Sequence, residues 1–341
     1  MCIRVAENQG RFPVPILSII IPVPDSTRAP DSAELLESTL LTVLENRPDD
    51  VEILVVHCGN YTDPYNLTDE VSYVELPRHS TLADCVHAGA EASHGAIVHL
   101  LASGMRVQAD WMSQVLCCFE DPECGAVSPV IVDQHDRILA TGLRLGLAGT
   151  RRLRCNKAWP GVDGPLVEAA FYRRDALLDL LEVNRLFADV GSQLLDVDLA
   201  MSLKVTGYRT VVVSACHILG PAPAFSKETG FVRGLHAERL FMRHAASVGW
   251  VKTLFLHPLA CGWQTVVDMA NGIPLTSLIG RLVGLLSLVD IRQYQFAMAE
   301  LRELKRKTDD MAPVDTIRLD TTRLPTVQAY PGESYPRARA G

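Results

Sequence analysis

The chain has 341 residues, of which 48% are hydrophobic and 21% are charged, and its formal net charge is -8. This composition is ordinary for a globular protein with a sizeable buried core, in one large or two small domains. The acidic balance argues against a nucleic-acid partner, because binding to phosphates needs clustered Lys and Arg.

The cysteines and the apolar runs indicate a cytoplasmic chain. None of the nine cysteines forms a Cys-x-x-Cys pair, so we expect reduced, buried thiols rather than a thiolate zinc site. The N-terminal segment 1–12 lacks the apolar stretch of a signal peptide. No run reaches the roughly 18 apolar residues of a membrane span.

In the first half of the chain, short apolar runs alternate with helical patterns. Residues 16–23 are a continuous β-branched run, which is typical of a strand buried on both faces. The alternation predicts βαβ units in a mainly parallel sheet, with a ligand crevice at the carboxyl ends of the strands. Further strands are expected over 51–56, 71–76 and 96–101, and helices over 32–46, 81–93 and 111–119.

The second half mixes strands and helices less regularly. From residue 308 the composition turns to Pro, Asp, Thr and Arg without periodicity, which predicts a disordered tail over 308–341. The preceding chain divides into an α/β domain over 13–225 and a helical extension over 226–307. Expected strands cover 125–132, 137–145, 166–171 and 210–214, and expected helices cover 175–181, 196–204, 231–248 and 275–307.

Several segments occur in the order and at the spacing of one known pattern. The stretch 96–112 (AIVHLLASGMRVQADWM) aligns without a gap to "strand, Asp-x-Asp, hydrophobic pair, Pro-x-Pro-x-Trp-Leu". On these motifs the segment 17–217 resembles the family 2 glycosyltransferases. The other matching pieces are SIIIPV at 18–23, HAG at 87–89 with Ser93 and Gly95, GAVSP at 125–129, ILATG at 138–142, AAFYRRDAL at 169–177, DVDL at 196–199, GYR at 207–209 and His217.

The resemblance implies a GT-A fold, a mixed and mainly parallel sheet sandwiched by helices, with a nucleotide-sugar donor at its rim. It implies donor-binding positions at Pro22, Asp25 and His57 and at the motif Ala102, Ser103 and Gly104. Members of the family usually hold Mg²⁺ or Mn²⁺ through carboxylates at this motif, to stabilise charge on the leaving diphosphate. Here those carboxylates are absent.

On the acceptor side, the resemblance places Asp196 at the position of the catalytic base and Asp198 at the acidic position that supports the loop. A carboxylate at a helix start is also a common N-cap, so the alternative interpretation is that Asp196 only caps the helix. His217 is either a metal ligand or a structural histidine without carboxylate partners. Arg173 and Arg174 either meet a phosphate or form a solvated helix start.

The segment 249–290 is apolar and carries few charges. One interpretation is core packing beneath the sheet. The other is peripheral contact with the inner face of a membrane, as the resemblance implies for members with lipid-linked acceptors, although interfacial helices normally carry more Lys and Arg than this stretch does.

These observations support two functions of different classes. The first is transfer of a sugar from a nucleotide-sugar donor to a hydroxyl of a glycan or lipid-linked acceptor, with the leaving charge met by backbone amides, basic side chains or a metal held elsewhere. The second is a catalytically inactive relative that binds a glycan or a partner enzyme. A nucleotidyltransferase is disfavoured, because no Gly-rich phosphate loop follows the first strand.

Overall fold

The computed structural model describes residues 15–24, 32–48, 50–59, 61–155, 161–185, 190–223, 230–249, 251–270, 275–286 and 288–311. The predicted donor residue Asp25 lies outside these residues, as does the predicted tail beyond Met311. Within the described part of the chain, no helix is both long enough and apolar enough to span a membrane.

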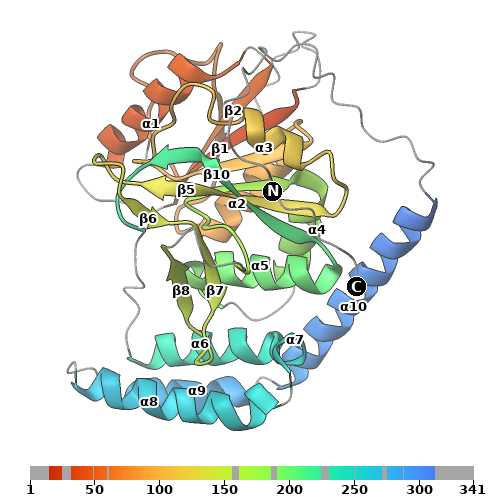
Figure 1. Cartoon of the computed structure of the whole chain (residues 1–341). Helices are drawn as coiled ribbons and strands as arrows, with labels where there is room; N and C mark the ends of the chain where they lie inside the picture. Colours follow the sequence, from red (N-terminus) through yellow and green to blue (C-terminus); the bar gives the residue numbers. More distant parts are fainter. Residues whose placement is uncertain are drawn as a thin grey trace, which may run out of the picture.

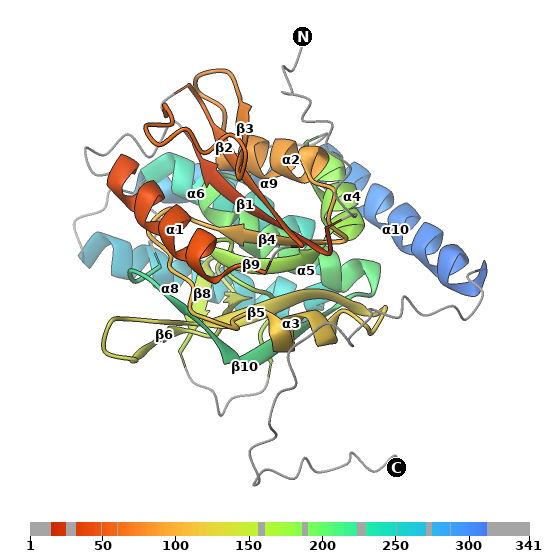
Figure 2. The ribbon, with the colours of Figure 1, turned by 90° about the horizontal axis from the view of Figure 1, so that it is seen from above.

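One large sheet organises the first two-thirds of the described chain (Figures 1 and 2). Its strands run in the order β10-β5-β9-β4-β1-β2-β3, with β6 paired to β5. The pairing is parallel except at β9 and β6. The predicted mixed, mainly parallel sheet is therefore confirmed. The strands are β1 (Leu17–Val23), β2 (Val51–His57), β3 (Ser72–Glu75), β4 (Ile97–Leu101), β5 (Cys124–Val132), β6 (Ile138–Ala140), β9 (Ala169–Arg173) and β10 (Arg209–Leu219).

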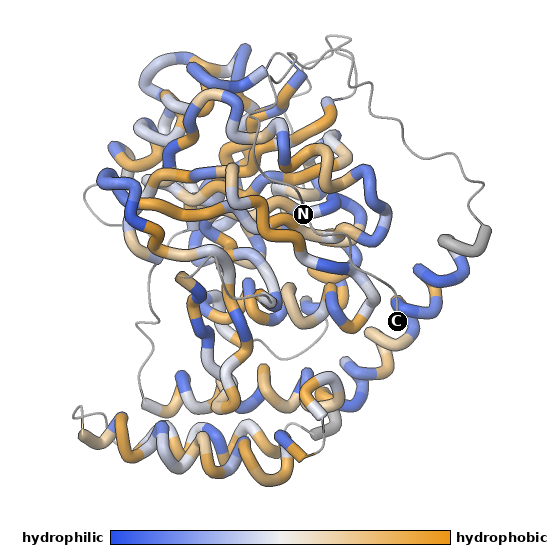
Figure 3. Tube along the Cα trace, in the orientation of Figure 1, coloured by the Kyte–Doolittle hydropathy of each residue, from blue (hydrophilic) through white to orange (hydrophobic). Residues whose placement is uncertain are grey.

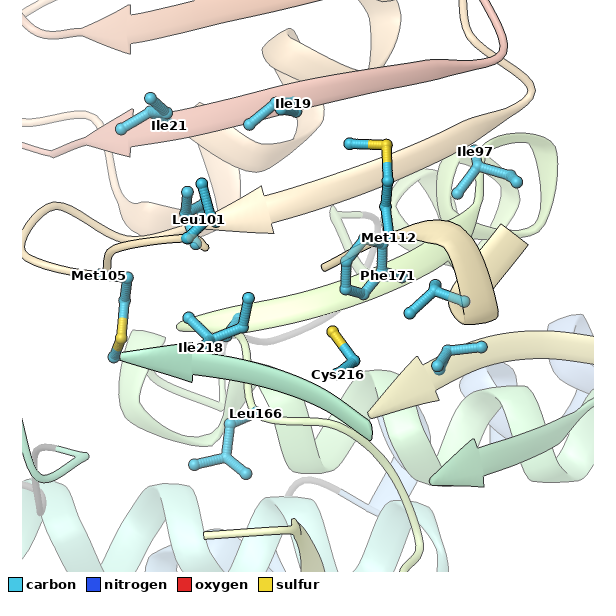
Figure 4. Packing of buried hydrophobic residues seen from close by; sticks show 14 of the residues in the cluster. Ile19, Ile21, Ile97, Leu101, Met105, Met112, Leu166, Phe171, Cys216 and Ile218 are labelled. Atoms are coloured by element: carbon cyan, nitrogen blue, oxygen red, sulfur yellow. The ribbon is translucent and has the colours of Figure 1, made fainter. Parts of the chain in front are cut away.

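Helices cover both faces of this sheet, because side chains alternate across each buried strand. Ile19 and Ile21 of β1 belong to one core cluster, shown in Figure 4, together with side chains of α1 and α3. The intervening Ile20 belongs to a second cluster with side chains of α2 and α4. The helices of this domain are α1 (Ser32–Asn46), α2 (Leu82–Ala92), α3 (Ser113–Cys118), α4 (Arg174–Arg185) and α5 (Leu195–Thr206), the last preceded by a 3₁₀ turn, η2 (Ser192–Leu194).

The structure departs from the sequence prediction where a local pattern is interrupted. The strand expected over 137–145 is split into β6 and β7 (Gly142–Leu145) at Gly142, whose φ of 144° favours glycine. The polar strand β8 (Arg151–Arg154), which pairs with β7, was not predicted because it lacks an apolar face. The helix expected over 275–307 is two helices, α9 (Thr276–Leu285) and α10 (Leu288–Met311).

Most of the C-terminal helices form a separate layer below the sheet in Figure 1, and α10 rises from this layer beside the α/β domain. Besides α9 and α10 they are α6 (Gly230–Arg243), α7 (Ala245–Val248), a π-helical turn, η3 (Lys252–Leu256), and α8 (His257–Ala270). Glycines allow α6 and α9 to approach closely: a Cβ at Gly234 would lie 1.9 Å from the Ser277 carbonyl oxygen, and one at Gly280 would lie 2.0 Å from that of Phe231. The interpretation of 249–290 as core packing is wrong for much of its apolar surface, since large apolar side chains on η3, α8 and α9 are exposed.

Candidate functional site

The loop after β4 leaves the carboxyl edge of the sheet, as predicted. Leu101 and Met105 are buried in the core cluster of Figure 4 and anchor the two ends of this loop. Between them, the Ala102 amide donates to the Glu168 carbonyl at 2.9 Å, and the Gly104 amide donates to Thr39 Oγ1 at 2.9 Å. The loop is therefore held between α1 and the start of β9.

This loop does not fit the divalent cation that the resemblance implies. Ala102 and Gly104 carry no ligand atom, and Ser103 supplies a hydroxyl where Mg²⁺ or Mn²⁺ needs several oxygen ligands, carboxylates above all. The Ser103 Oγ is buried and has no hydrogen-bond partner among the described residues. An unpaired buried hydroxyl is costly, so this position is one where a partner is expected.

A buried ion-paired triad lies beside the loop. Arg151 on β8 donates from Nη2 to both carboxylate oxygens of Glu168, at 2.8 and 2.6 Å. The same guanidinium contacts Asp196 Oδ2 through Nε at 2.8 Å and through Nη2 at 2.6 Å. The remaining Asp196 oxygen accepts from the Val197 amide at 2.8 Å. One arginine thus joins the first turn of α5 to the residue that precedes β9.

Burial dominates the electrostatics of Asp196. Its side chain is 1% exposed, and loss of hydration raises its pKa to about 6, while Arg151 acts in the opposite direction. For Arg151, burial lowers the pKa, but the two carboxylates raise it by more, so the guanidinium stays charged.

We expect Asp196 to make the free energy of unfolding depend on pH. Its folded pKa of about 6 lies above the ordinary value of 3.8, so the folded state binds more protons between these values. We expect the free energy of unfolding to fall as pH rises through this window, by on the order of 3 kcal/mol from this group. Urea denaturation at several pH values should show a steeper fall in the unaltered chain than in Asp196→Asn. Parallel pH profiles for the two proteins would contradict this assignment.

Asp198 faces away from the loop and joins the two layers of the molecule. Its oxygens accept from Arg243 Nη1 and pair with His244 Nε2, both at 2.7 Å, and all three side chains are buried. Burial raises the pKa of Asp198, but the two partners outweigh it, and the net pKa lies below the ordinary value. Its supporting role is thus directed at α6 and at the residue that follows it.

The predicted donor residues on the first two strands are part of the sheet edge. Pro22 is buried in β1 opposite Val56. His57 ends β2, where its Nδ1 accepts from the Gly59 amide at 3.2 Å and its ring meets Tyr61 and Tyr73 edge to face. Burial lowers the pKa of His57, which favours the neutral ring. A neutral imidazole can form a hydrogen bond with a base edge.

Arg173 and Arg174 do not lie on the acceptor side, so that prediction is wrong. Strand β9 is antiparallel to β4, which puts Arg173 opposite Ile97 at the start of β4, at the far edge of the sheet from the loop. Arg173 donates to the carbonyls of Phe119, Asp121 and Cys124. Arg174 donates to the Ala90 carbonyl and Ser93 Oγ, both at 3.1 Å. Both guanidinium groups tie neighbouring segments together.

The metal role of His217 is not supported by its surroundings. Its Nε2 lies 3.0 Å from the Ser214 carbonyl oxygen. Among the described residues, the one group of His, Cys, Asp and Glu compact enough for a metal is Glu238, His257 and Cys261, on α6 and α8. Both ring nitrogens of His257 already face oxygens, Nδ1 that of Leu147 at 2.6 Å and Nε2 that of Glu238 at 3.0 Å. This group is a hydrogen-bonded clamp between the helices and the turn after β7.

Arg151 and Glu168 were not predicted as site residues from the sequence. Arg151 begins a run of basic residues on an unpredicted strand, and nothing local distinguishes it from its neighbours. Glu168 carried a usable signal, because it is an acidic residue within the predicted buried strand 166–171. A charge at such a position is seldom retained without a partner or a task.

The chain was also compared with known proteins, and solved structures with a similar course of the chain were found. No protein-family model matches the chain, and no curated protein matches its sequence. The chain is similar to the mannosyltransferase PcManGT from Pyrobaculum calidifontis, in complex with GDP-Man and Mn²⁺ (20% identity, TM-score 0.47, 86% of this chain and 88% of that one). It is also similar to GalNAc-T7 with UDP, GalNAc and Mn²⁺ (13% identity, TM-score 0.49, 77% of this chain and 58% of that one). Similarities at this level assign no residue, donor or acceptor to this chain.

Proposed function

We propose that this chain is a glycosyltransferase that transfers a sugar from a nucleotide-sugar donor to a hydroxyl acceptor. The observation that carries the proposal is the meeting of the loop after β4 with the Glu168–Arg151–Asp196 triad at the carboxyl edge of the sheet. In an open, mainly parallel α/β sheet this edge is where ligands bind. The ordered series of family 2 motifs along 17–217 supports the same assignment.

The donor would lie along the ends of β1, β2 and β4. His57 offers a neutral ring to the nucleobase. Ser103 offers the diphosphate or the sugar a hydroxyl that has no partner in the described part of the chain. Because residues 102–104 do not fit a divalent cation, the charge on the leaving diphosphate would be met by backbone amides or by basic side chains at this edge. No step of the proposed transfer depends on Mg²⁺ or Mn²⁺ at residues 102–104.

Purified protein incubated with a panel of nucleotide sugars tests this function. We expect a nucleotide-induced rise in melting temperature with one donor, and release of the nucleoside diphosphate when an acceptor is present. Both signals should survive chelation of divalent metals by EDTA. Calorimetry that detects no binding of any nucleotide or nucleotide sugar, with or without Mn²⁺, would remove the proposal.

A non-catalytic scaffold is the second candidate, and one observation favours it. Asp196, which the sequence resemblance places at the position of the base, is almost fully buried, and both of its oxygens are engaged. A scaffold of this kind would bind a glycan or a partner enzyme without turning over a donor. Binding of a donor without release of nucleoside diphosphate, over a broad panel of acceptors, would favour the scaffold.

We further propose that the helical extension lies on a lipid bilayer, which suits a lipid-linked acceptor. On α8 and α9 the charged side chains point inward: Asp268 pairs with Arg233, and Arg281 pairs with Glu238. The outer side is hydrocarbon and aromatic, and we call it the apolar face. It comprises Leu254, Phe255, Leu256, Leu259, Trp263, Val266, Met269, Leu275, Leu278, Ile279, Leu282, Val283, Leu285 and Leu286, all exposed.

The composition of the apolar face favours lipid over a protein partner. Protein interfaces are only about 56–65% apolar and carry about one hydrogen bond per 100–200 Å². Among residues 251–270 and 275–286, the exposed formal charge is Lys252 alone, at one end of this surface. Figure 3 shows the contrast with α10, which is largely hydrophilic. A surface this apolar matches the boundary region of a bilayer.

A further inference from the structure

The two carboxylates of the triad differ in their access to solvent. Asp196 is 1% exposed, whereas Glu168 is 18% exposed. Asp196 has three donor nitrogens around it, two from Arg151 on one oxygen and the Val197 amide on the other. Among the described residues, Glu168 accepts from one nitrogen, Nη2 of Arg151, which is shared by its two oxygens. Each Glu168 oxygen therefore keeps lone-pair capacity for another donor.

Glu168 also lies next to the loop after β4. Its carbonyl accepts from the Ala102 amide, so its backbone is bonded to the loop that replaces the cation motif. A general base must come within hydrogen-bond reach of the hydroxyl from which it takes a proton. Glu168 is the more exposed of the two carboxylates, so an acceptor at the loop can reach it more readily than Asp196.

We infer that Glu168 is the general base of the proposed sugar transfer and that Arg151 is the positioning residue that orients it. This inference rests on the proposed function. In the step, the acceptor hydroxyl gives its proton to Glu168 while its oxygen bonds to the anomeric carbon. The bond from that carbon to the diphosphate breaks, and its electron pair leaves with the phosphate oxygen. Asp196 holds the far side of Arg151.

Arg151 can position Glu168 because its own geometry is fixed from both sides. Two of its nitrogens contact Asp196 on buried α5, and Nη2 also contacts both oxygens of Glu168. A planar guanidinium constrains the orientation of a carboxylate more tightly than an ammonium does. Loss of Arg151 would leave Glu168 free to rotate and Asp196 buried without its cation.

Steady-state kinetics of Glu168→Gln and Asp196→Asn test the inference, with the donor that the panel identifies. We expect Glu168→Gln to lower kcat about 100-fold or more, with little change in KM for the donor. In the unaltered enzyme, protonation of the base should lower kcat at acid pH, which gives the pH–rate profile an acid limb. Glu168→Gln should lack this acid limb. Arg151→Lys should recover part of the kcat that Arg151→Met loses. Glu120→Gln, an exposed carboxylate at the far edge of the sheet, is the matched control and should match the unaltered enzyme.

The outcomes separate this inference from the proposed function. If the unaltered chain transfers sugar and Glu168→Gln keeps both kcat and the acid limb, Glu168 is not the base. If Asp196→Asn alone loses both, Asp196 is the base and the inference is overturned. If the unaltered chain neither binds nor uses any donor, the proposed function fails and the role of Glu168 fails with it.

Discussion

Asp198→Asn is expected to lower the free energy of unfolding by about 3–5 kcal/mol. The reason is that removing the carboxylate charge from a buried ion-paired network leaves the Arg243 guanidinium buried and uncompensated. Arg243 and His244 are both buried and both direct a nitrogen at Asp198 at 2.7 Å. Because Arg243 and His244 lie at the end of α6, the loss should fall on the contact between the α/β domain and the helical extension. Urea denaturation of the variant and the unaltered chain measures it.

Two further variants make this prediction specific. Asp175→Asn removes a carboxylate that is 89% exposed at the start of α4, and it should change stability by no more than about 0.5 kcal/mol. The double variant Asp198→Asn/Arg243→Met should regain part of the loss, since it removes the uncompensated charge as well. If Asp198→Asn proves as stable as Asp175→Asn, Asp198 does not hold the two layers together.

The sequence predicted the sheet better than the second half of the chain, for a physical reason. The strands β1, β2 and β4 are buried on both faces. They therefore appear in the sequence as continuous apolar runs, which the local hydrophobic pattern reveals. Strand β8 is a run of arginines and leucine paired only with β7, and it has no such pattern. Within the helix expected over 275–307, α9 ends at Leu285 and α10 begins at Leu288, and neither proline nor a run of turn residues marks this change in the sequence.

The sequence predicted only those parts of the candidate site whose position depends on the course of the backbone alone. Ala102, Ser103 and Gly104 were placed correctly at the carboxyl edge, because the end of a predicted strand carries them there. Arg173 was misplaced because a local pattern does not reveal that β9 runs antiparallel to β4. The triad of Arg151, Glu168 and Asp196 joins three elements and depends on side-chain contacts that only the folded chain creates.

The apolar face is expected to bind lipid vesicles, and Leu259→Glu/Trp263→Glu is expected to weaken that binding about 100-fold or more. Each of these side chains is 70% exposed on α8, so the substitutions cost little in folding. In a bilayer, each would lose roughly 1.5–3 kcal/mol of apolar burial, and two such losses give the stated change. Vesicle sedimentation with phosphatidylcholine, at increasing lipid concentration, measures the partition coefficient.

The low charge of the apolar face predicts how vesicle binding depends on anionic lipid and on salt. Because its exposed charge is limited to Lys252, binding should need no anionic lipid and should survive high salt, unlike binding through a polybasic surface. Leu41→Glu, at an exposed leucine on α1, is the matched control and should bind as the unaltered chain does. A chain that ignores vesicles but forms a dimer, and becomes monomeric on Leu259→Glu/Trp263→Glu, would show that a second copy rather than a bilayer covers this surface.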